Sequence, residues 1–352
     1  MIARLRPVAW ELLLVGLIVV AFIWSSTLSP YFLDPVNLLN SGAYFVLFSL
    51  MAFGLFPIVV QGEIDISLAS TLAVSAVVLG KLSVAGVPLA LGLPIALALC
   101  AVLGAVNGLL VAAAGLPSLA VTLGTLGAYR GIAYILAGDQ GVVGITPEYT
   151  ALGSTWVGIV PVSLLLVLAA AAVFTVLMRS TTFGRNSYAI GSSPAASRMA
   201  GVPVVRTRVV AYMIGGVMAG LAGLVWVAQY QSARGDNADG AILFVLTAVV
   251  LGGVSIKGGS GRAVGVLLAI VLLGTIQTGM KLANVPGTSQ TLVIGALLVG
   301  SIGIPRAIQL IRNRAGSSRP AGGAGTSADG PEEHRGEVTP ASPHHQQDHQ
   351  KG

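Results

Sequence analysis

The sequence predicts an all-α membrane protein, a polytopic helix bundle of about ten transmembrane helices. Charged residues make up 9% of the chain and apolar residues 55%, whereas about a quarter of the residues in a soluble domain are charged. The apolar residues also fall into runs, several of which are long enough to cross a hydrocarbon core of about 30 Å. This composition excludes an ordinary soluble domain.

The expected spans are separated by short polar segments. The third and eighth are short for a bilayer, which is typical of broken or re-entrant segments. The first lacks a small-x-small cleavage site and is longer than the core of a signal peptide, so we expect an uncleaved span. We place the spans at about 8–27, 43–60, 68–82, 88–112, 116–137, 160–178, 209–227, 242–252, 263–282 and 288–304.

Basic and acidic residues gather in different connecting segments. Short cytoplasmic loops of membrane proteins carry the basic excess, so the pattern predicts a multi-pass protein of the cytoplasmic membrane with both termini in the cytoplasm. The net charge of +6 then reflects orientation in the bilayer, and nucleic-acid binding is not expected. The basic residues assigned to the inner side are Arg4, Arg6, Arg179, Arg185, Arg198, Arg206, Arg208, Lys257, Arg262, Arg306, Arg312 and Arg314.

Residues 315–352 differ in character from the rest of the chain. They are rich in glycine, proline, serine and charged residues and have almost no large apolar side chains. Such a segment cannot bury enough apolar surface to fold alone. We therefore predict a membrane domain over residues 1–314, followed by a disordered cytoplasmic tail. All four histidines lie in this tail, which leaves no histidine metal site within the spans.

Residues 181–208 form a polar segment between two apolar runs, with several arginines and no acidic residue. A Ser-Pro pair beginning at Ser193 is typical of a helix start, and Gly201 is typical of a helix end about two turns later. Ala196 and Ala200 would give this helix a flat face that suits docking into a groove on another protein. A passive, positively charged loop is the alternative, but the glycines that precede the helix favour a fixed geometry.

Four sequence blocks follow one another in a recognisable order. They are GEIDIS at 62–67, VTLGTLGAYRGIAYILAGD at 121–139, FGR-x-x-YAIG with P-A-x-x-R-x-x-G-V within 183–202, and VVLGGVSIKGGSGRAVGVLL at 249–268. Together they resemble the permeases of bacterial ABC-type sugar importers, the family that serves ribose, xylose, galactose, rhamnose and autoinducer-2. The resemblance covers nearly the whole chain up to about Arg314.

The resemblance implies that residues 181–208 are a cytoplasmic coupling loop, which transmits movement from an ATPase. The chain departs from the family pattern at Ser192 and Ser193, where asparagine is common, and at Ser197, where a second alanine is usual. The docking surface would be slightly more polar as a result. The residues that the resemblance assigns to ATPase coupling are Gly184, Arg185, Gly191, Ala196, Arg198 and Gly201.

The resemblance also implies the function and the partners. The chain would be the membrane-spanning subunit of an importer for a monosaccharide or similar small polyol. It would work with two cytoplasmic ATP-binding subunits, an extracytoplasmic solute-binding protein and a second permease, identical or related. The glycine-rich run at 258–265 lacks the Lys-Ser/Thr of a phosphate-binding loop, so ATP and Mg²⁺ would bind to the partner and this chain would bind no cofactor. The runs GVSIKGGSG and LANVPG look closest to the rhamnose and autoinducer-2 branch.

A few polar residues inside the spans are candidates for the solute path or its gate. Hydroxyl and amide groups can make the weak contacts that transport requires, and intramembrane ionisable groups are functional candidates. Asp65 and Ser67 can also simply cap the start of the third span, while the family block has glycine in place of Glu63. Arg130 either lies beside the path or pairs with a helix-end carbonyl or a loop acid such as Asp139. The candidates are Asp65, Ser67, Asn107, Tyr129, Arg130 and Tyr134.

Two other classes of protein remain as alternatives. An ion-coupled secondary transporter or channel would need a relay of carboxylates or histidines within the spans, and the spans are nearly free of ionisable groups. A membrane-embedded enzyme would have to use Glu63 and Asp65 as an acid and base pair, without any further catalytic group. Glycines also recur four apart, which predicts close helix packing inside the bundle or in a dimer contact. These pairs are Gly104 and Gly108, Gly127 and Gly131, and Gly216 and Gly220.

Overall fold

The computed structural model describes residues 2–317 of the chain. The described residues up to Ala307 form one unit, and those from Ile308 onward belong to a second. The described residues form fourteen α-helices and one short β-hairpin, so the prediction of an all-α bundle is confirmed. The predicted disordered tail lies outside the described residues, apart from 315–317, which continue the last helix.

The helices vary widely in length. The hairpin is formed by β1 (Trp156–Val157) and β2 (Val160–Pro161), which pair in antiparallel fashion. The helices are α1 (Ile2–Leu28), α2 (Pro35–Tyr44), α3 (Val46–Val60), α4 (Leu68–Val84), α5 (Leu89–Ala112), α6 (Ser118–Ala137), α7 (Pro147–Ser154), α8 (Val162–Ser180), α9 (Thr182–Ser192), α10 (Pro194–Met199), α11 (Val204–Tyr230), α12 (Ala241–Leu251), α13 (Ala263–Leu282) and α14 (Gly287–Ser317).

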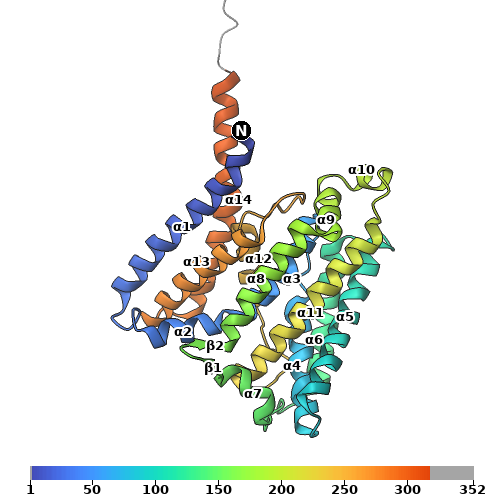
Figure 1. The fold of residues 1–352 in the computed structure, drawn as a ribbon, viewed down its shortest axis with the longest axis vertical. Coiled ribbons are helices and arrows are strands. Elements are labelled where there is room, and N and C mark those ends of the chain that lie inside the picture. Colours follow the sequence, from blue (N-terminus) through green and yellow to red (C-terminus); the bar gives the residue numbers. More distant parts are fainter. Residues whose placement is uncertain (1, 318–352) are drawn as a thin grey trace, which may run out of the picture. The chain divides into compact units, whose positions relative to one another are not determined.

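The centre of the first unit is built from α3 and α4. Every residue of α3 except Phe48 is buried, and α4 is buried over most of its length. A helix that is apolar on all sides belongs in the interior of a bundle. The long helix α11 packs against α3, α4 and α5, while α6 covers α4 and α13 packs against α1 (Figure 1).

Six helices are long and apolar enough to cross a membrane. A seventh candidate is the pair α2 and α3, which is bent by 42° at Phe45. The expected second span therefore begins earlier than predicted, where Asp34 caps α2 and Pro35 takes its first position. The third and eighth spans, α4 with 17 residues and α12 with 11, are short as predicted. Each of the ten expected segments is mostly helical, although 160–161 form β2 and the second segment is broken at Phe45. The number of complete spans stays a prediction.

Small residues bring α5 and α11 close together. A Cβ atom on Gly104 would overlap the carbonyl of Tyr212, and one on Gly216 would overlap the carbonyl of Cys100. Two of the three predicted glycine pairs thus pack inside the bundle, where lipid supplies no hydrophobic drive for helix association. In contrast, a Cβ atom on Gly127 or Gly131 would meet no described atom within 4 Å.

We expect Gly216→Leu to destabilise the protein and Gly127→Leu to be tolerated. The first substitution forces a side chain into the backbone of α5, which costs about 1–3 kcal/mol or more in a packed interior, whereas the second adds a side chain to open space. The measurement is the midpoint of thermal unfolding of each variant in detergent. Equal midpoints for the two variants would show that α5 and α11 are not packed in this way.

Candidate functional site

The connection between α3 and α4 carries a buried carboxylate. Gly62, with a φ of +81°, turns the chain out of α3, and Asp65 then lies almost fully buried just before α4. Its Oδ1 accepts hydrogen bonds from the backbone N–H of Ser67 at 2.8 Å and from the Ser67 hydroxyl at 2.6 Å. Ser67 is the N-cap residue of α4, but its side chain makes no capping bond. Asp65 accepts from the N–H and hydroxyl of Ser67 and not from an N–H of α4, so neither side chain makes the predicted cap.

Two neighbouring helices extend this hydrogen-bond network. The amide of Asn107, on α5, donates to the hydroxyl of Ser67 at 2.8 Å. The hydroxyl of Tyr129, on α6, lies 3.0 Å from the carbonyl oxygen of Leu103 and 3.2 Å from Oδ1 of Asn107. Four of the six predicted path residues are thus brought together. We call Asp65, Ser67, Asn107 and Tyr129 the polar network.

The start of α6 fixes the same connection from another side. The backbone N–H of Ile64 donates to the hydroxyl of Ser118 at 3.3 Å, and the hydroxyl of Thr122 lies 3.4 Å from the Ile64 carbonyl oxygen. Buried backbone groups outside regular structure need such partners. These bonds fix the connection against α6, with Asp65 and Ser67 buried and Ile64 half-buried.

Glu63 and Asp65 do not form a pair. The carboxylate of Glu63 lies 2.9 Å from the guanidinium of Arg208 on α11, and the two side chains are 15% and 13% exposed. Asp65 instead faces the hydroxyl and amide groups of the polar network. The geometry gives no support to an acid and base pair of the kind a hydrolase would use. Sequence analysis missed the partner of Glu63 because Arg208 lies far along the chain.

Arg130 and Tyr134 lie away from the polar network. The Nη1 of Arg130 donates to the carbonyl oxygens of Gly235 at 2.8 Å and Asn237 at 2.6 Å, and its Nη2 lies 4.0 Å from Asp239. The ring of Tyr134 packs against Gly235. This is the expected pairing of Arg130 with carbonyls and a loop acid, but the acid is Asp239 rather than Asp139. Both residues fasten α6 to the loop that precedes α12.

Three segments meet backbone to backbone beside the end of α3. A Cβ atom on Gly191, at the end of α9, would overlap the carbonyl oxygen of Val60 and the backbone nitrogen of Gly259. A Cβ atom on Gly258 would lie 2.8 Å from the Cα atom of Gly191 and 2.8 Å from the nitrogen of Gly62. The N–H of Gly259 donates to the carbonyl of Val60 at 2.8 Å. We call Gly62, Gly191, Gly258 and Gly259 the glycine junction.

Side chains of α9 reinforce the glycine junction. The amide of Gln61 donates to the hydroxyl of Ser187 at 3.1 Å, and the hydroxyl of Tyr188 donates to the carbonyl of Gly261 at 2.8 Å. Burial raises the pKa of Tyr188, although Arg262 opposes the shift. The phenol therefore stays protonated and remains a hydrogen-bond donor at neutral pH. Sequence analysis did not identify these residues, because nothing in their spacing shows which segments meet.

The predicted helix in the polar segment is present as α10. Ser193 caps its start by accepting from the N–H of Ala196 at 3.3 Å, Pro194 takes the first position, and Gly201 adopts a φ of +77° just after its end. The prediction of a short helix between these signals is confirmed. Gly184 is buried against the carbonyl of Met178.

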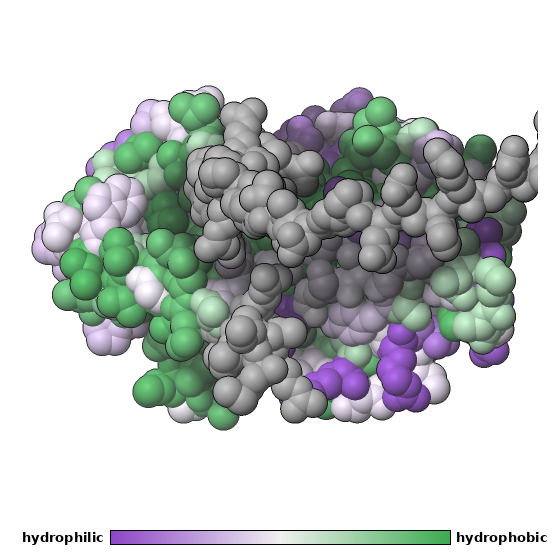
Figure 2. All heavy atoms as spheres, turned by 90° about the horizontal axis from the view of Figure 1, so that it is seen from above, coloured by the Kyte–Doolittle hydropathy of each residue, from purple (hydrophilic) through white to green (hydrophobic). Residues whose placement is uncertain are grey.

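One surface of α10 is left uncovered in this chain. Ala196 and Arg198 are exposed, as is Arg185 on α9, and Met199 is 91% exposed. Ser197 is the buried residue of α10. Seen from the end at which α9 and α10 lie, hydrophilic surface gathers on the side of these helices, and hydrophobic surface predominates on the α1 side (Figure 2). Sequence analysis overlooked Met199, although it lies one turn after Ala196.

We expect Asp65→Asn to leave stability unchanged or raised and Asp65→Leu to lower it. Asparagine keeps an oxygen that accepts from Ser67 and replaces an ionisable group that is buried among neutral groups by a neutral one, whereas leucine leaves buried donors unpaired at about 1–3 kcal/mol each. Thermal unfolding in detergent at neutral pH measures the effect. If Asp65→Asn lowered the midpoint of thermal unfolding as much as Asp65→Leu, the negative charge itself would be what stabilises the site.

Comparisons with known proteins agree with the sequence blocks. A family model described as "Branched-chain amino acid transport system / permease component" matches residues 37–302. The chain is 34% identical over 307 residues to the "Autoinducer 2 import system permease protein LsrD" of Photorhabdus laumondii, covering 86% of this chain and 92% of that protein. It is 34% identical over 311 residues to the protein of the same name from Escherichia coli K12, covering 87% and 94%. No solved structure matches the chain.

Proposed function

The chain belongs to the family of branched-chain amino acid transport system permease components, and from this premise we propose the solute, the partners and the coupling route. It is an inner-membrane permease of an ABC importer of the sugar type. We infer that its solute is a small neutral polyol close in chemistry to autoinducer 2. The observation that carries this inference is the similarity to autoinducer 2 import permeases over more than nine tenths of their length.

We propose that α10 docks into a groove of a cytoplasmic ATP-binding subunit. The helix offers the small residue Ala196 and the flexible, apolar Met199 on an uncovered surface, with Arg198 beside them. An exposed apolar side chain between small residues is suited to an anchor in a partner's groove. ATP and Mg²⁺ would bind to that partner, and both termini would lie on the same side of the membrane as α10.

We propose that the glycine junction transmits the movement of the ATPase to the bundle interior. A push on α10 reaches α9 directly, because only Ser193 separates the two helices. At Gly191 the backbone of α9 abuts Val60, and Gln61 is hydrogen-bonded to Ser187. Asp65, which belongs to the polar network, follows Gln61 by four residues along the chain. Rigid contacts between packed elements carry such displacements.

The opposite end of the bundle would receive the solute. α7 and the hairpin of β1 and β2 lie at that end (Figure 1), and we propose that it faces an extracytoplasmic solute-binding protein. A second permease, identical or related, would complete the path. The buried Asp65 could suggest ion coupling, but its hydrogen-bond partners are hydroxyl and amide groups, which do not form a relay of titratable groups.

Reconstitution in proteoliposomes tests the proposed function. We expect uptake of autoinducer 2 or a related polyol that requires ATP, the ATP-binding subunits and the solute-binding protein together. The matched control contains the same proteins with a non-hydrolysable ATP analogue and should show only the background rate. Uptake that an ion gradient drives in the absence of the ATP-binding subunits would instead support a secondary transporter.

Two variants should separate docking from transmission. Ala196→Glu places a charge on the docking surface, so we expect it to abolish co-purification of the ATP-binding subunit and uptake together. Gly191→Val drives a side chain into Val60 and Gly259, so we expect co-purification to persist while uptake falls by about tenfold or more, the equivalent of about 1.4 kcal/mol.

Two substitutions at exposed positions serve as controls for these two variants. Ala151→Glu adds the same charge to the exposed face of α7 at the other end of the bundle. Gly124→Val adds the same side chain where a Cβ atom would meet nothing within 4 Å. Both controls should keep co-purification of the ATP-binding subunit, and Gly124→Val should also keep uptake. Ala151→Glu is scored by co-purification alone, because α7 lies at the end that we propose to face the solute-binding protein. If Gly191→Val also transports normally, the glycine junction does not lie on the coupling route.

A further inference from the structure

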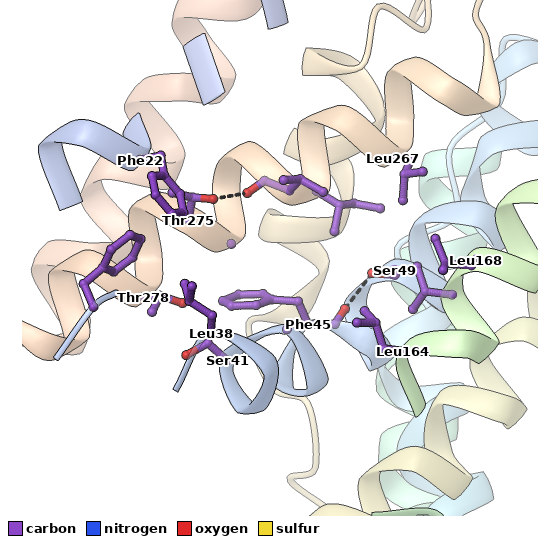
Figure 3. Close-up of a pocket in the computed structure, with 16 residues that line it drawn as sticks. Phe22, Leu38, Ser41, Phe45, Ser49, Leu164, Leu168, Leu267, Thr275 and Thr278 are labelled. Atoms are coloured by element: carbon purple, nitrogen blue, oxygen red, sulfur yellow. Dashed lines mark hydrogen bonds between the residues drawn. The ribbon is translucent and has the colours of Figure 1, made fainter. Parts of the chain in front are cut away.

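A groove lies between α1, α2, α3, α8 and α13, away from the polar network and from α10. It encloses about 290 Å³. Figure 3 shows Leu267 and Thr278 of α13 at different positions along it. These two residues are eleven positions apart, so the groove follows α13 for about 16 Å. It is therefore long and narrow.

The groove is lined mainly by apolar side chains. Its lining includes the rings of Phe22, Phe32 and Phe45 and several leucine side chains. The hydroxyl of Ser49 donates to the carbonyl of Phe45 at 2.7 Å, and that of Thr275 donates to the carbonyl of Val271 at 2.8 Å (Figure 3). These two hydroxyl protons are already used on their own helices. Two further hydroxyl groups, those of Ser41 and Thr278, line the groove, which is few for a polyol that would lose its hydration here, whereas an alkyl chain would fit.

A positive charge lies at one end of the groove. Lys281 follows the lining residue Thr278 by one helical turn, at the end of α13. Its ammonium group lies 5.4 Å from the ring centre of Tyr44 and 5.9 Å from that of Phe45, which lines the groove. Within residues 2–317, no carboxylate lies within 4 Å of Lys281. Lysine and tyrosine at the end of a membrane helix are typical of the headgroup level of a bilayer.

We propose that this groove is a binding site for one phospholipid, with an acyl chain along α13 and the phosphate at Lys281. The combination of a narrow apolar channel with an ammonium group at its headgroup end selects this ligand. Because an acyl chain is equally apolar in the bilayer and in the groove, selectivity should come from the headgroup charge. An anionic lipid is therefore favoured over a zwitterionic one, whose own ammonium group opposes Lys281.

The site is independent of the proposed solute and of ATPase coupling. The proposed orientation would also place the lipid in the outer leaflet, because Lys281 is at the end of α13 opposite to the glycine-rich turn beside α9. This choice of leaflet is the one part of the proposal that rests on the proposed function. The lipid would fill the space between the pair α1 and α13 and the helix α8. In that position it would support the packing of α2, which contacts α8 and α13.

Native mass spectrometry of the purified full-length chain tests the headgroup contact. The protein is titrated with phosphatidylglycerol or phosphatidylcholine of matched acyl chains. We expect one phosphatidylglycerol to be retained in preference, and Lys281→Gln to weaken its retention about fivefold, the effect of one lysine near an anionic headgroup. The matched control is Lys81→Gln, which removes an exposed lysine from the end of α4 and should change nothing. Equal retention of both lipids, or equal effects of the two variants, would overturn the proposal.

A second pair of variants tests the acyl-chain channel. Leu168→Trp fills the groove, and we expect it to reduce retention of both lipids. Leu165→Trp, on the same helix but outside the lining, should leave retention unchanged. A photoreactive benzophenone side chain at position 168 should give an adduct with the mass of a phospholipid. An adduct to another polypeptide would overturn the proposal, because the groove would then be a protein contact.

Discussion

The contact on which the rest of this structure depends is the approach of three backbones at the glycine junction. Gly191 lies against the carbonyl of Val60 and the nitrogen of Gly259 with no side chain between them. Hydrogen bonds from Gln61 and Tyr188 hold α9 in place on both sides. Because backbone atoms cannot rotate out of the way as side chains do, α9 cannot move toward α3 without displacing it.

The buried carboxylate follows from the same arrangement. The chain leaves α3 at the glycine junction and runs into the interior before α4 begins, so α4 is short and its N-terminal end is buried. Asp65 lies at that end, where its Oδ1 accepts from the N–H of Ser67. Hydroxyl groups of Ser67 and Tyr129 and the amide of Asn107 complete the surroundings. A short central helix and a buried acid are therefore two aspects of one feature.

The sequence predicts the elements of this fold better than their contacts. Apolar runs and the signals at Ser193 and Gly201 are local, so the helices and the ends of α10 could be predicted. The partner of Glu63 is Arg208, from a distant helix, and residue spacing carries no information about it. The same limit applies to Arg130, for which a loop acid such as Asp139 was one of several possible neighbours and whose acidic neighbour is Asp239. Likewise Gly104 and Gly127 stand in identical four-residue patterns, yet spacing alone does not reveal which helix face is covered.

The polar network has a consequence for how the proposed solute would pass. Asp65 Oδ1 already accepts two hydrogen bonds, the Ser67 hydroxyl both donates and accepts, and Asn107 is bonded through both ends of its amide. In this conformation these groups satisfy one another and offer little to a polyol. They are better suited to holding the start of α4 closed than to lining an open path. Movement of α9 through the glycine junction would have to break these bonds, and the freed hydroxyl and amide groups could then contact the solute weakly enough to release it.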